Sequence, residues 1–279
     1  MTSHDVVSRA RRQLGTRRVG HAGTLDPMAT GVLVLGVDRA TRLLGHLALH
    51  DKSYDATIRL GASTVTDDVD GDVVTVAEPD ALRSISNEQV QSALLAMIGT
   101  IRQRPSSVSA IKVDGRRAYD RVRAGEDVEL PEREVEIAEI LVSGFSRDFA
   151  GIDVDVSVTC STGTYIRAIA RDLGQALRVG GHLTSLRRTR VGPFHLQEAV
   201  GIDDIASGLH SMDDIASRCF PVVVLDSRQA ADARHGRAQM WPGAPVPGPH
   251  ALVDDAGKLL ALGQPEGMSM KYVAVFATD

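Results

Sequence analysis

The chain has 279 residues, 43% of them hydrophobic and 24% charged, which is typical of a folded globular protein with room for one large and one small domain. Two cysteines are too few for a disulfide framework, the most apolar uncharged run (residues 29–37) is too short to span a bilayer, and the N-terminus does not resemble a secretory signal, so we expect a cytoplasmic protein. The net charge of −5 does not suggest a polyanionic partner, yet basic residues are concentrated in segments 1–20, 101–125 and 160–192.

The first hundred residues predict short helices and strands in mixed order. Thr2 or Ser3 caps an amphipathic first helix that ends near Leu14, and Ser86 with Gln89 forms a capping box. The other expected elements are a buried strand at 32–37, a helix at 41–50, a half-buried strand at 53–60, a turn at 67–72, a strand at 73–76 and the helix that the capping box begins, which extends to about 98.

The rest of the chain predicts a long basic excursion at about 100–128, helical near 116–123, and then a return to strands and helices. Strands are expected at 135–142, 152–160 and 183–191, and a helix at 164–177. After residue 220 the elements become shorter: a strand at 222–225, a helix at 227–236, a proline loop at 241–250, a hairpin at 251–262 and a strand at 272–277. This order predicts an α+β fold, with one domain at 1–219 and a small module at 220–279.

Several patterns that resemble known sites lack essential residues. Thr66–Gly71 resembles a calcium loop without its two anchoring acids, and we interpret it as a turn. His46 and His50 lack the intervening glutamate of a zinc-protease helix, and no phosphate loop or serine elbow is present. We therefore expect no metal site.

The stretch GHAGTLDPMATG (residues 20–31) presents one carboxylate, Asp26, among three glycines. Pro27 biases Asp26 toward extended backbone, and the glycines permit close approaches that a side chain would block. Further along, the turn CSTGTYIR (160–167) brings Arg167, which could pair bidentately with a carboxylate. Tyr54 and Tyr165 could stack on a base or simply be core residues, and these observations leave open an aspartate-based enzyme or an RNA-binding module.

Four segments together resemble the TruB-type tRNA pseudouridine synthases. GHAGTLDPMATGVLVLG resembles their catalytic segment and Lys52-Ser53-Tyr54 the start of their next strand, while CSTGTYIRAIARDLG and HLTSLRR (182–188) resemble their later motifs in the correct order. The resemblance implies a mixed, largely antiparallel sheet flanked by helices, followed by a small β-rich C-terminal module similar to the PUA domain.

The same resemblance implies the activity: isomerisation of the T-loop uridine at tRNA position 55 to pseudouridine, with Asp26 as nucleophile or base. The reaction adds and removes nothing, so no cofactor is implied. Arg167 is expected to pair with Asp26 and keep it ionised, and the remaining substrate-binding residues implied are His21, Tyr54, Tyr165 and Leu186.

The resemblance also implies that the basic excursion grips the RNA. The expected backbone contacts come from Lys112, Arg116, Arg117 and Arg121, and the partner is the T arm of tRNA. No obligate protein partner, no membrane and a monomeric state are expected. Two alternatives share these features: a non-catalytic RNA-binding or RNA-remodelling protein on the same fold, and a guide-dependent synthase in a ribonucleoprotein.

One further expectation concerns the N-terminus. In the family, the residues equivalent to 1–5 are preceded by a strand with a Lys-Pro-x-Gly element, and here Met1 stands where that strand should have ended. The expectation is that the chain begins at an internal position, which would leave apolar surface uncovered.

Overall fold

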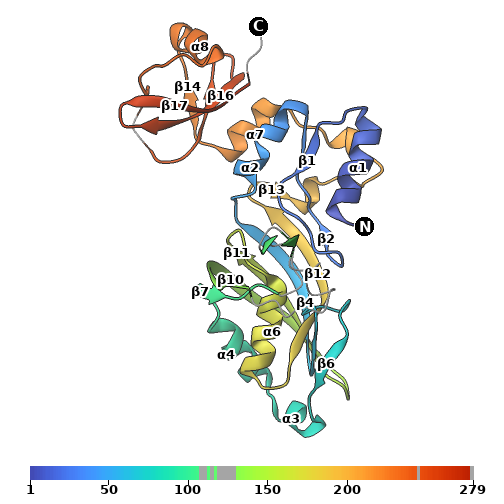
Figure 1. Cartoon of the computed structure of the whole chain (residues 1–279). Coiled ribbons are helices and arrows are strands. Elements are labelled where there is room, and N and C mark those ends of the chain that lie inside the picture. The colour runs from blue at the N-terminus through green and yellow to red at the C-terminus, as the bar shows by residue number, and fades with distance from the viewer. Residues whose placement is uncertain (107–111, 114–115, 118–129, 244–245, 277–279) are drawn as a thin grey trace.

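The computed structural model describes residues 1–106, 112–113, 116–117, 130–243 and 246–276, and it shows an α+β protein, as the sequence predicts. A long central sheet carries helices, an N-terminal lobe lies at one end of it, and a small β-rich module lies beyond that lobe (Figure 1). No helix in the described ranges is long and apolar enough to cross a membrane.

The N-terminal lobe begins with α1 (Ser3–Leu14), where the Thr2 hydroxyl and the Asp5 carboxylate form the capping box that starts the helix. The segments that follow are β1 (Val19–His21), β2 (Thr30–Gly31), β3 (Leu35–Val37), the 3₁₀ helix η1 (Asp38–Arg42) and α2 (Leu44–Leu47).

Two predictions for this lobe are wrong in extent. The strand expected at 32–37 covers only β3, because the chain changes partners: the Val32 amide bonds to the Arg188 carbonyl, whereas the Val34 carbonyl accepts from Ala22. The helix expected at 41–50 is replaced by the 3₁₀ turn of η1 and the single turn of α2, since the Leu43 amide bonds to Ala40, three residues back.

The central sheet has seven strands and is largely antiparallel, as expected. It contains β4 (Lys52–Leu60), β7 (Gly99–Gln103), β10 (Arg133–Arg147), β11 (Ile152–Cys160), β12 (Gly181–Val191) and β13 (Phe194–His195), in the order β13-β12-β4-β11-β10-β7. The short strand β2 joins β12 in parallel. Along β4 the alternate residues Tyr54, Ala56, Ile58 and Leu60 are buried, which confirms the predicted period of two.

Helices cover one face of this sheet (Figure 1). They are α4 (Asn87–Leu95), which starts at the predicted Ser86–Gln89 capping box, and α6 (Ile166–Ala176). Gly181 lets α6 lie close to β12, because a Cβ there would stand 2.4 Å from the Ala170 carbonyl oxygen. Beyond them lie α3 (Pro79–Ser84) and the hairpin of β5 (Ala62–Thr64) and β6 (Val73–Val76).

Little of the basic excursion is described. Lys112–Val113 (β8) pairs antiparallel with Arg116–Arg117 (β9), so these residues form a hairpin instead of the helix expected near 116–123. The rest of that predicted helix lies outside the described residues.

The C-terminal part contains η2 (Leu196–Glu198), η3 (Ile205–Gly208), α7 (Met212–Cys219), β14 (Val222–Val224), α8 (Ser227–Arg234), β15 (His250–Val253), β16 (Leu259–Glu266) and β17 (Ser269–Val275). The last four strands form one sheet in the order β14-β15-β16-β17, and β15 with β16 is the predicted hairpin. The Arg39 and Arg42 guanidinium groups of η1 donate to the carbonyls of Phe276 and Val275, which attaches this module to the N-terminal lobe.

Candidate active site

The loop that carries Asp26 connects β1 to β2 and is held from several sides. β1 pairs with β3, and β2 pairs with β12 through Thr30 opposite Arg187. The Leu25 amide donates to the Ser3 hydroxyl at 2.9 Å. Gly31 has φ +100°, and a Cβ there would lie 2.1 Å from the Arg188 carbonyl oxygen, so the close approach of β2 to β12 requires glycine.

The structure brings Asp26 and Arg167 together as the sequence predicts. Arg167 Nε donates to Asp26 Oδ2 at 3.0 Å, and Nη2 donates to Oδ1 at 3.0 Å, which makes the pair bidentate. The Arg167 side chain is 4% exposed and the Asp26 side chain 31% exposed. The carboxylate is therefore oriented by a buried cation while one side of it remains open to solvent.

A second carboxylate reaches the same guanidinium. Arg167 Nη1 donates to the Thr66 carbonyl at 2.9 Å and lies 3.4 Å from Asp68 Oδ2, and the Asp68 side chain is 4% exposed. Arg167 thus stands between two acids, only one of which is accessible. Residues 66–71 do form the expected turn, but that interpretation missed the part that Asp68 takes in the site.

Tyr54 and Leu186 belong to the main hydrophobic cluster on which the Asp26 loop rests. Tyr54 is 8% and Leu186 5% exposed, and Met28 and Ala29 of the loop pack against the same cluster. Burial raises the pKa of the Tyr54 phenol from 10.0 to about 12, because the apolar surroundings disfavour the phenolate. Tyr54 and Leu186 therefore form part of the apolar surface that lies beside the Asp26 loop.

Tyr165 lies at the N-terminal end of α6 and is half-buried. Its backbone is fixed by Gln103, whose side chain accepts from the Tyr165 amide at 2.8 Å and donates to the Tyr165 carbonyl at 3.1 Å. The Arg133 guanidinium lies 5.4 Å from the centre of the Tyr165 ring, a cation–π distance.

His21 lies at the end of β1, at the start of the Asp26 loop. Burial, reinforced by the positive charge of Arg188, lowers the pKa of His21 and favours the neutral imidazole. Its Nδ1 is buried and has no hydrogen-bond partner among the described residues. The geometry thus places His21 at the base of the loop.

Three protein-family models together match residues 11–277. The family model described as TruB family pseudouridylate synthase (N terminal domain) matches residues 11–166. The chain belongs to the TruB family. A tRNA pseudouridylate synthase B C-terminal domain matches residues 167–225, and a tRNA pseudouridine synthase II C-terminal domain matches residues 220–277.

Relatives in the TruB family are similar over nearly the full length. The protein named tRNA pseudouridine synthase B from Corynebacterium diphtheriae is 49% identical, and the match covers 99% of this chain and 92% of that protein. The protein of the same name from Cutibacterium acnes is 53% identical over 95% of this chain and 90% of its own length. The one from Thermobifida fusca is 51% identical over 99% of this chain and 94% of its own length. Among solved structures, a Cbf5-Nop10-Gar1 complex matches with TM-score 0.76 and 25% identity, covering 99% of this chain and 82% of that chain. An archaeal box H/ACA sRNP Nop10-Cbf5 complex matches with TM-score 0.73 and 24% identity, covering 99% of this chain and 83% of that chain. At this identity the match supports the fold alone.

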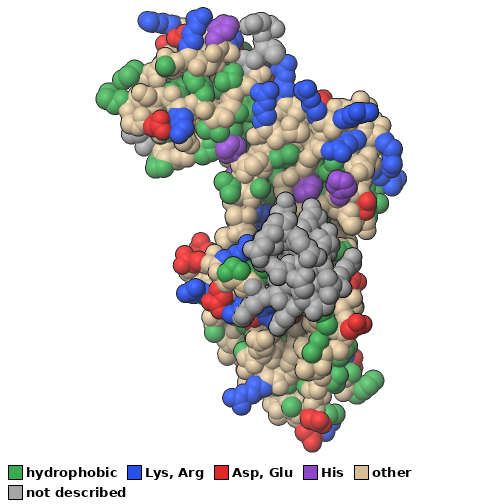
Figure 2. All heavy atoms as spheres, in the orientation of Figure 1, with side chains coloured by type: hydrophobic (Ala, Val, Ile, Leu, Met, Phe, Trp, Pro, Cys, Tyr) green, Lys and Arg blue, Asp and Glu red, His purple; other side chains and the backbone are tan. Residues whose placement is uncertain are grey.

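The expected RNA backbone contacts of this TruB-family protein are only partly described. Lys112, Arg116 and Arg117 are placed by their backbone in the β8–β9 hairpin, and Arg121 lies outside the described residues. A different basic surface is fully described: arginine side chains gather over α1 and the segment before β1 (Figure 2). Its exposed members include Arg11, Arg12, Arg17 and Arg18.

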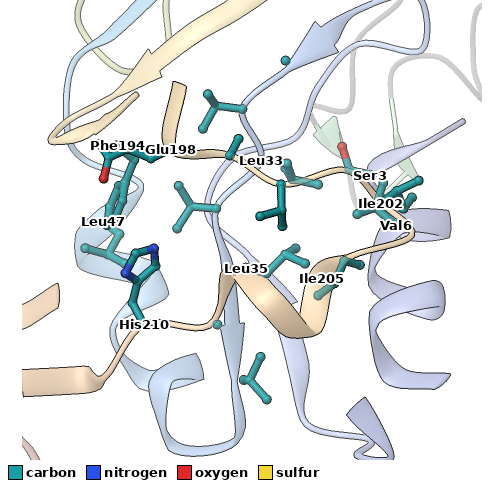
Figure 3. A pocket seen from close by; sticks show the side chains of 18 of the residues that line it. Ser3, Val6, Leu33, Leu35, Leu47, Phe194, Glu198, Ile202, Ile205 and His210 are labelled. Carbon is teal, nitrogen blue, oxygen red and sulfur yellow. The ribbon is translucent and has the colours of Figure 1, made fainter. Parts of the chain in front are cut away.

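An apolar groove of about 480 Å³ lies behind the Asp26 loop, between α1, the segment 32–37 and the segment 194–215 (Figure 3). Leu25 and Ala29 line it, but Asp26 and Arg167 do not, so the groove is separate from the charged site. Among the described residues no group of three or more His, Cys, Asp or Glu side chains is arranged to hold a metal ion.

Proposed function

We propose that this protein converts the T-loop uridine at position 55 of tRNA to pseudouridine. The observation that carries the proposal is the bidentate Asp26–Arg167 pair, on a loop fixed by its neighbours, in a chain about half identical to proteins named tRNA pseudouridine synthase B. The carboxylate is accessible and oriented, as a group that must meet one atom of a bound nucleotide needs to be.

The reaction breaks the N1–C1′ glycosidic bond, turns the uracil and rejoins it through C5; a proton leaves C5 and N1 gains one, so all atoms are conserved. Asp26 acts as nucleophile or base in this sequence. Arg167 keeps Asp26 ionised and oriented, because a bidentate guanidinium favours the charged carboxylate. No cofactor is needed for the atom balance.

The uridine must leave its stack to reach Asp26, which costs a few kcal/mol. We propose that Tyr54 stacks on the extruded uracil, that Tyr165 and Leu186 line its pocket and that His21 supports the opened T loop. Contacts from Lys112, Arg116, Arg117 and Arg121 to phosphates, and from the module at 220–279 to the rest of the tRNA, would offset the cost of extrusion.

We expect the protein to act in the cytoplasm, as a monomer and without a guide RNA. The similar Cbf5 structures contain partner proteins, as their names state. The relatives that are about half identical carry the name of a tRNA enzyme, which favours stand-alone action on tRNA.

The test uses unmodified tRNA transcript, single-turnover conditions and chemical mapping of pseudouridine. We expect modification at position 55, and none in a transcript with cytidine there. Asp26→Asn should remove turnover while tRNA binding stays within a few-fold, because phosphate contacts carry most of the affinity. Appreciable product from Asp26→Asn would refute the role of Asp26, and tight binding without turnover by the unsubstituted protein would favour the non-catalytic alternative.

A further inference from the structure

Arg188 of β12 is an unusual buried residue: it is 1% exposed, and its guanidinium donates to three backbone carbonyls. Nε donates to the Val32 carbonyl at 2.8 Å, Nη2 to the Gly23 carbonyl at 3.0 Å and Nη1 to the Thr24 carbonyl at 3.4 Å. Within the described ranges no Asp or Glu oxygen lies within ion-pair distance of it. A buried cation without a carboxylate partner is costly, so its retention requires a reason.

The three carbonyls lie on both sides of Asp26 in the sequence. Gly23 and Thr24 precede it and Val32 follows it, so one side chain joins the two arms of the catalytic loop. The backbone of Arg188 adds a further contact, because its carbonyl accepts from the Val32 amide at 2.8 Å. The loop is thereby attached to β12 through both the side chain and the backbone of one residue.

Arginine suits this position because its planar fork presents several donors in fixed directions, whereas lysine offers a single ammonium. The other buried cation nearby illustrates the difference. Lys52 Nζ donates to the carbonyls of Ala48 and His50, which are two residues apart on one turn. Arg188 instead joins Val32 to Gly23 and Thr24 on the far side of Asp26.

We propose that Arg188 is a positioning residue that fixes the Asp26 loop against β12, so that the carboxylate meets the extruded nucleotide in a reactive orientation. It acts mainly through the loop, also interacts with the Tyr54 phenol, and does not touch the reacting atoms. This inference rests on the proposed function, and it assigns to Arg188 a part separate from that of Arg167, which contacts the carboxylate itself.

The experiment compares Arg188→Gln and Arg188→Lys in the full chain with Arg190→Gln as a matched control. Arg190 lies on the same strand and is also partly buried, but its guanidinium contacts Asp51, Ser53 and Gly192 and not the Asp26 loop. Each variant is measured for the single-turnover rate at saturating protein, for the Kd of tRNA, for thermal unfolding and for hydrogen exchange of peptides covering 22–34.

We expect Arg188→Gln to lower the single-turnover rate about 100-fold, the scale of the decrease for a misplaced reacting group, with the Kd within about threefold. Exchange should accelerate over 22–34 and stay unchanged over 152–160, and Arg188→Lys should be intermediate. Arg190→Gln should keep the rate within about threefold.

A folded Arg188→Gln with a normal rate, or with rate and affinity reduced equally, would overturn the inference. If Arg188→Gln does not fold, the single-turnover rate of Arg188→Lys decides: a reduced rate supports the proposal and a normal rate rejects it. If neither variant folds, Arg188 is needed for global stability and the proposal is rejected. Failure of the unsubstituted protein to form pseudouridine would instead reject the proposed function, so the two failures are distinguishable.

Discussion

The substitution Arg167→Lys measures how much the two-point hydrogen bonding of Arg167 to Asp26 contributes to the reaction rate. It preserves the positive charge beside Asp26 and removes the planar guanidinium that donates to both carboxylate oxygens. In the structure Arg167 gives the carboxylate two hydrogen bonds of 3.0 Å, and a lysine ammonium can replace one of them. A hydrogen bond to a charged group is worth about 1.5–3 kcal/mol. With about 1.4 kcal/mol per tenfold in rate, the expected decrease in the single-turnover rate is roughly 10- to 150-fold.

Binding should change little in Arg167→Lys, because a side chain that is 4% exposed cannot reach a phosphate. The matched control is Arg59→Lys. Arg59 also uses two nitrogens on carboxylates, Nη2 to both oxygens of Asp148 at 2.6 and 2.7 Å and Nη1 to Asp153 at 3.0 Å, but on an unrelated part of the sheet. The assay is single-turnover pseudouridine formation together with filter binding of tRNA. A rate within twofold of the unsubstituted protein, or an equal decrease in Arg59→Lys, would refute the reasoning.

Four other predictions concern Asp68, Tyr54 and the basic excursion; three of them use the same assays, and the fourth uses urea unfolding. Asp68→Asn should slow the single-turnover rate about tenfold, because it removes a charge-assisted interaction with Arg167 worth about 1.5 kcal/mol; an unchanged rate would exclude Asp68 from the site. Tyr54→Ala should lose stacking worth about 1–3 kcal/mol, whereas Tyr54→Phe should retain it. Because burial raises the phenol pKa to about 12 from 10.0, the native protein should lose stability relative to Tyr54→Phe as pH rises from 10 to 12, by about 2 kcal/mol in urea unfolding. Neutralising Arg116, Arg117 and Arg121 together should weaken tRNA binding and flatten its salt dependence by about one unit for each phosphate that is no longer neutralised, and an unchanged slope would mean that the excursion does not grip RNA.

Local patterns predicted most of the fold. The alternation of 53–60, the strand at 152–160, the Ser86–Gln89 capping box and the hairpin after residue 250 are all found, because each depends on neighbours in the sequence. The strand expected at 32–37 is shorter because its extent depends on partners that are distant in the sequence. Its apolar run is continuous, but its partners change from β12 to β1, and no local pattern records such a change.

The sequence predicted part of the candidate site, namely the residues that stand in distinctive local motifs. Asp26 and Arg167 stand in distinctive local sequences, and the structure joins them across the fold. Asp68 was missed because its partner is about a hundred residues away, and an acidic turn that faces solvent looks the same in a sequence as one that faces a buried guanidinium. The antiparallel pairing of Lys112–Val113 with Arg116–Arg117 was also missed, since basic Ser- and Gly-rich sequence has little periodicity to indicate a strand.

The charges around the site divide into two groups with different tasks. Asp26, Arg167 and Asp68 form a contiguous cluster whose formal charge is −1, and the accessible member is Asp26, the carboxylate that we propose to react. Arg188 and Lys52 are buried cations that donate to backbone carbonyls: Arg188 to the loop that carries Asp26, and Lys52 to the turn that precedes β4. Hydrophobic side chains could fill these two positions at lower desolvation cost, but they could not hold carbonyls in fixed places. Arg188 therefore restricts the backbone on both sides of Asp26, and the proposed reaction, which depends on contact with one atom of an extruded nucleotide, would benefit from that restriction.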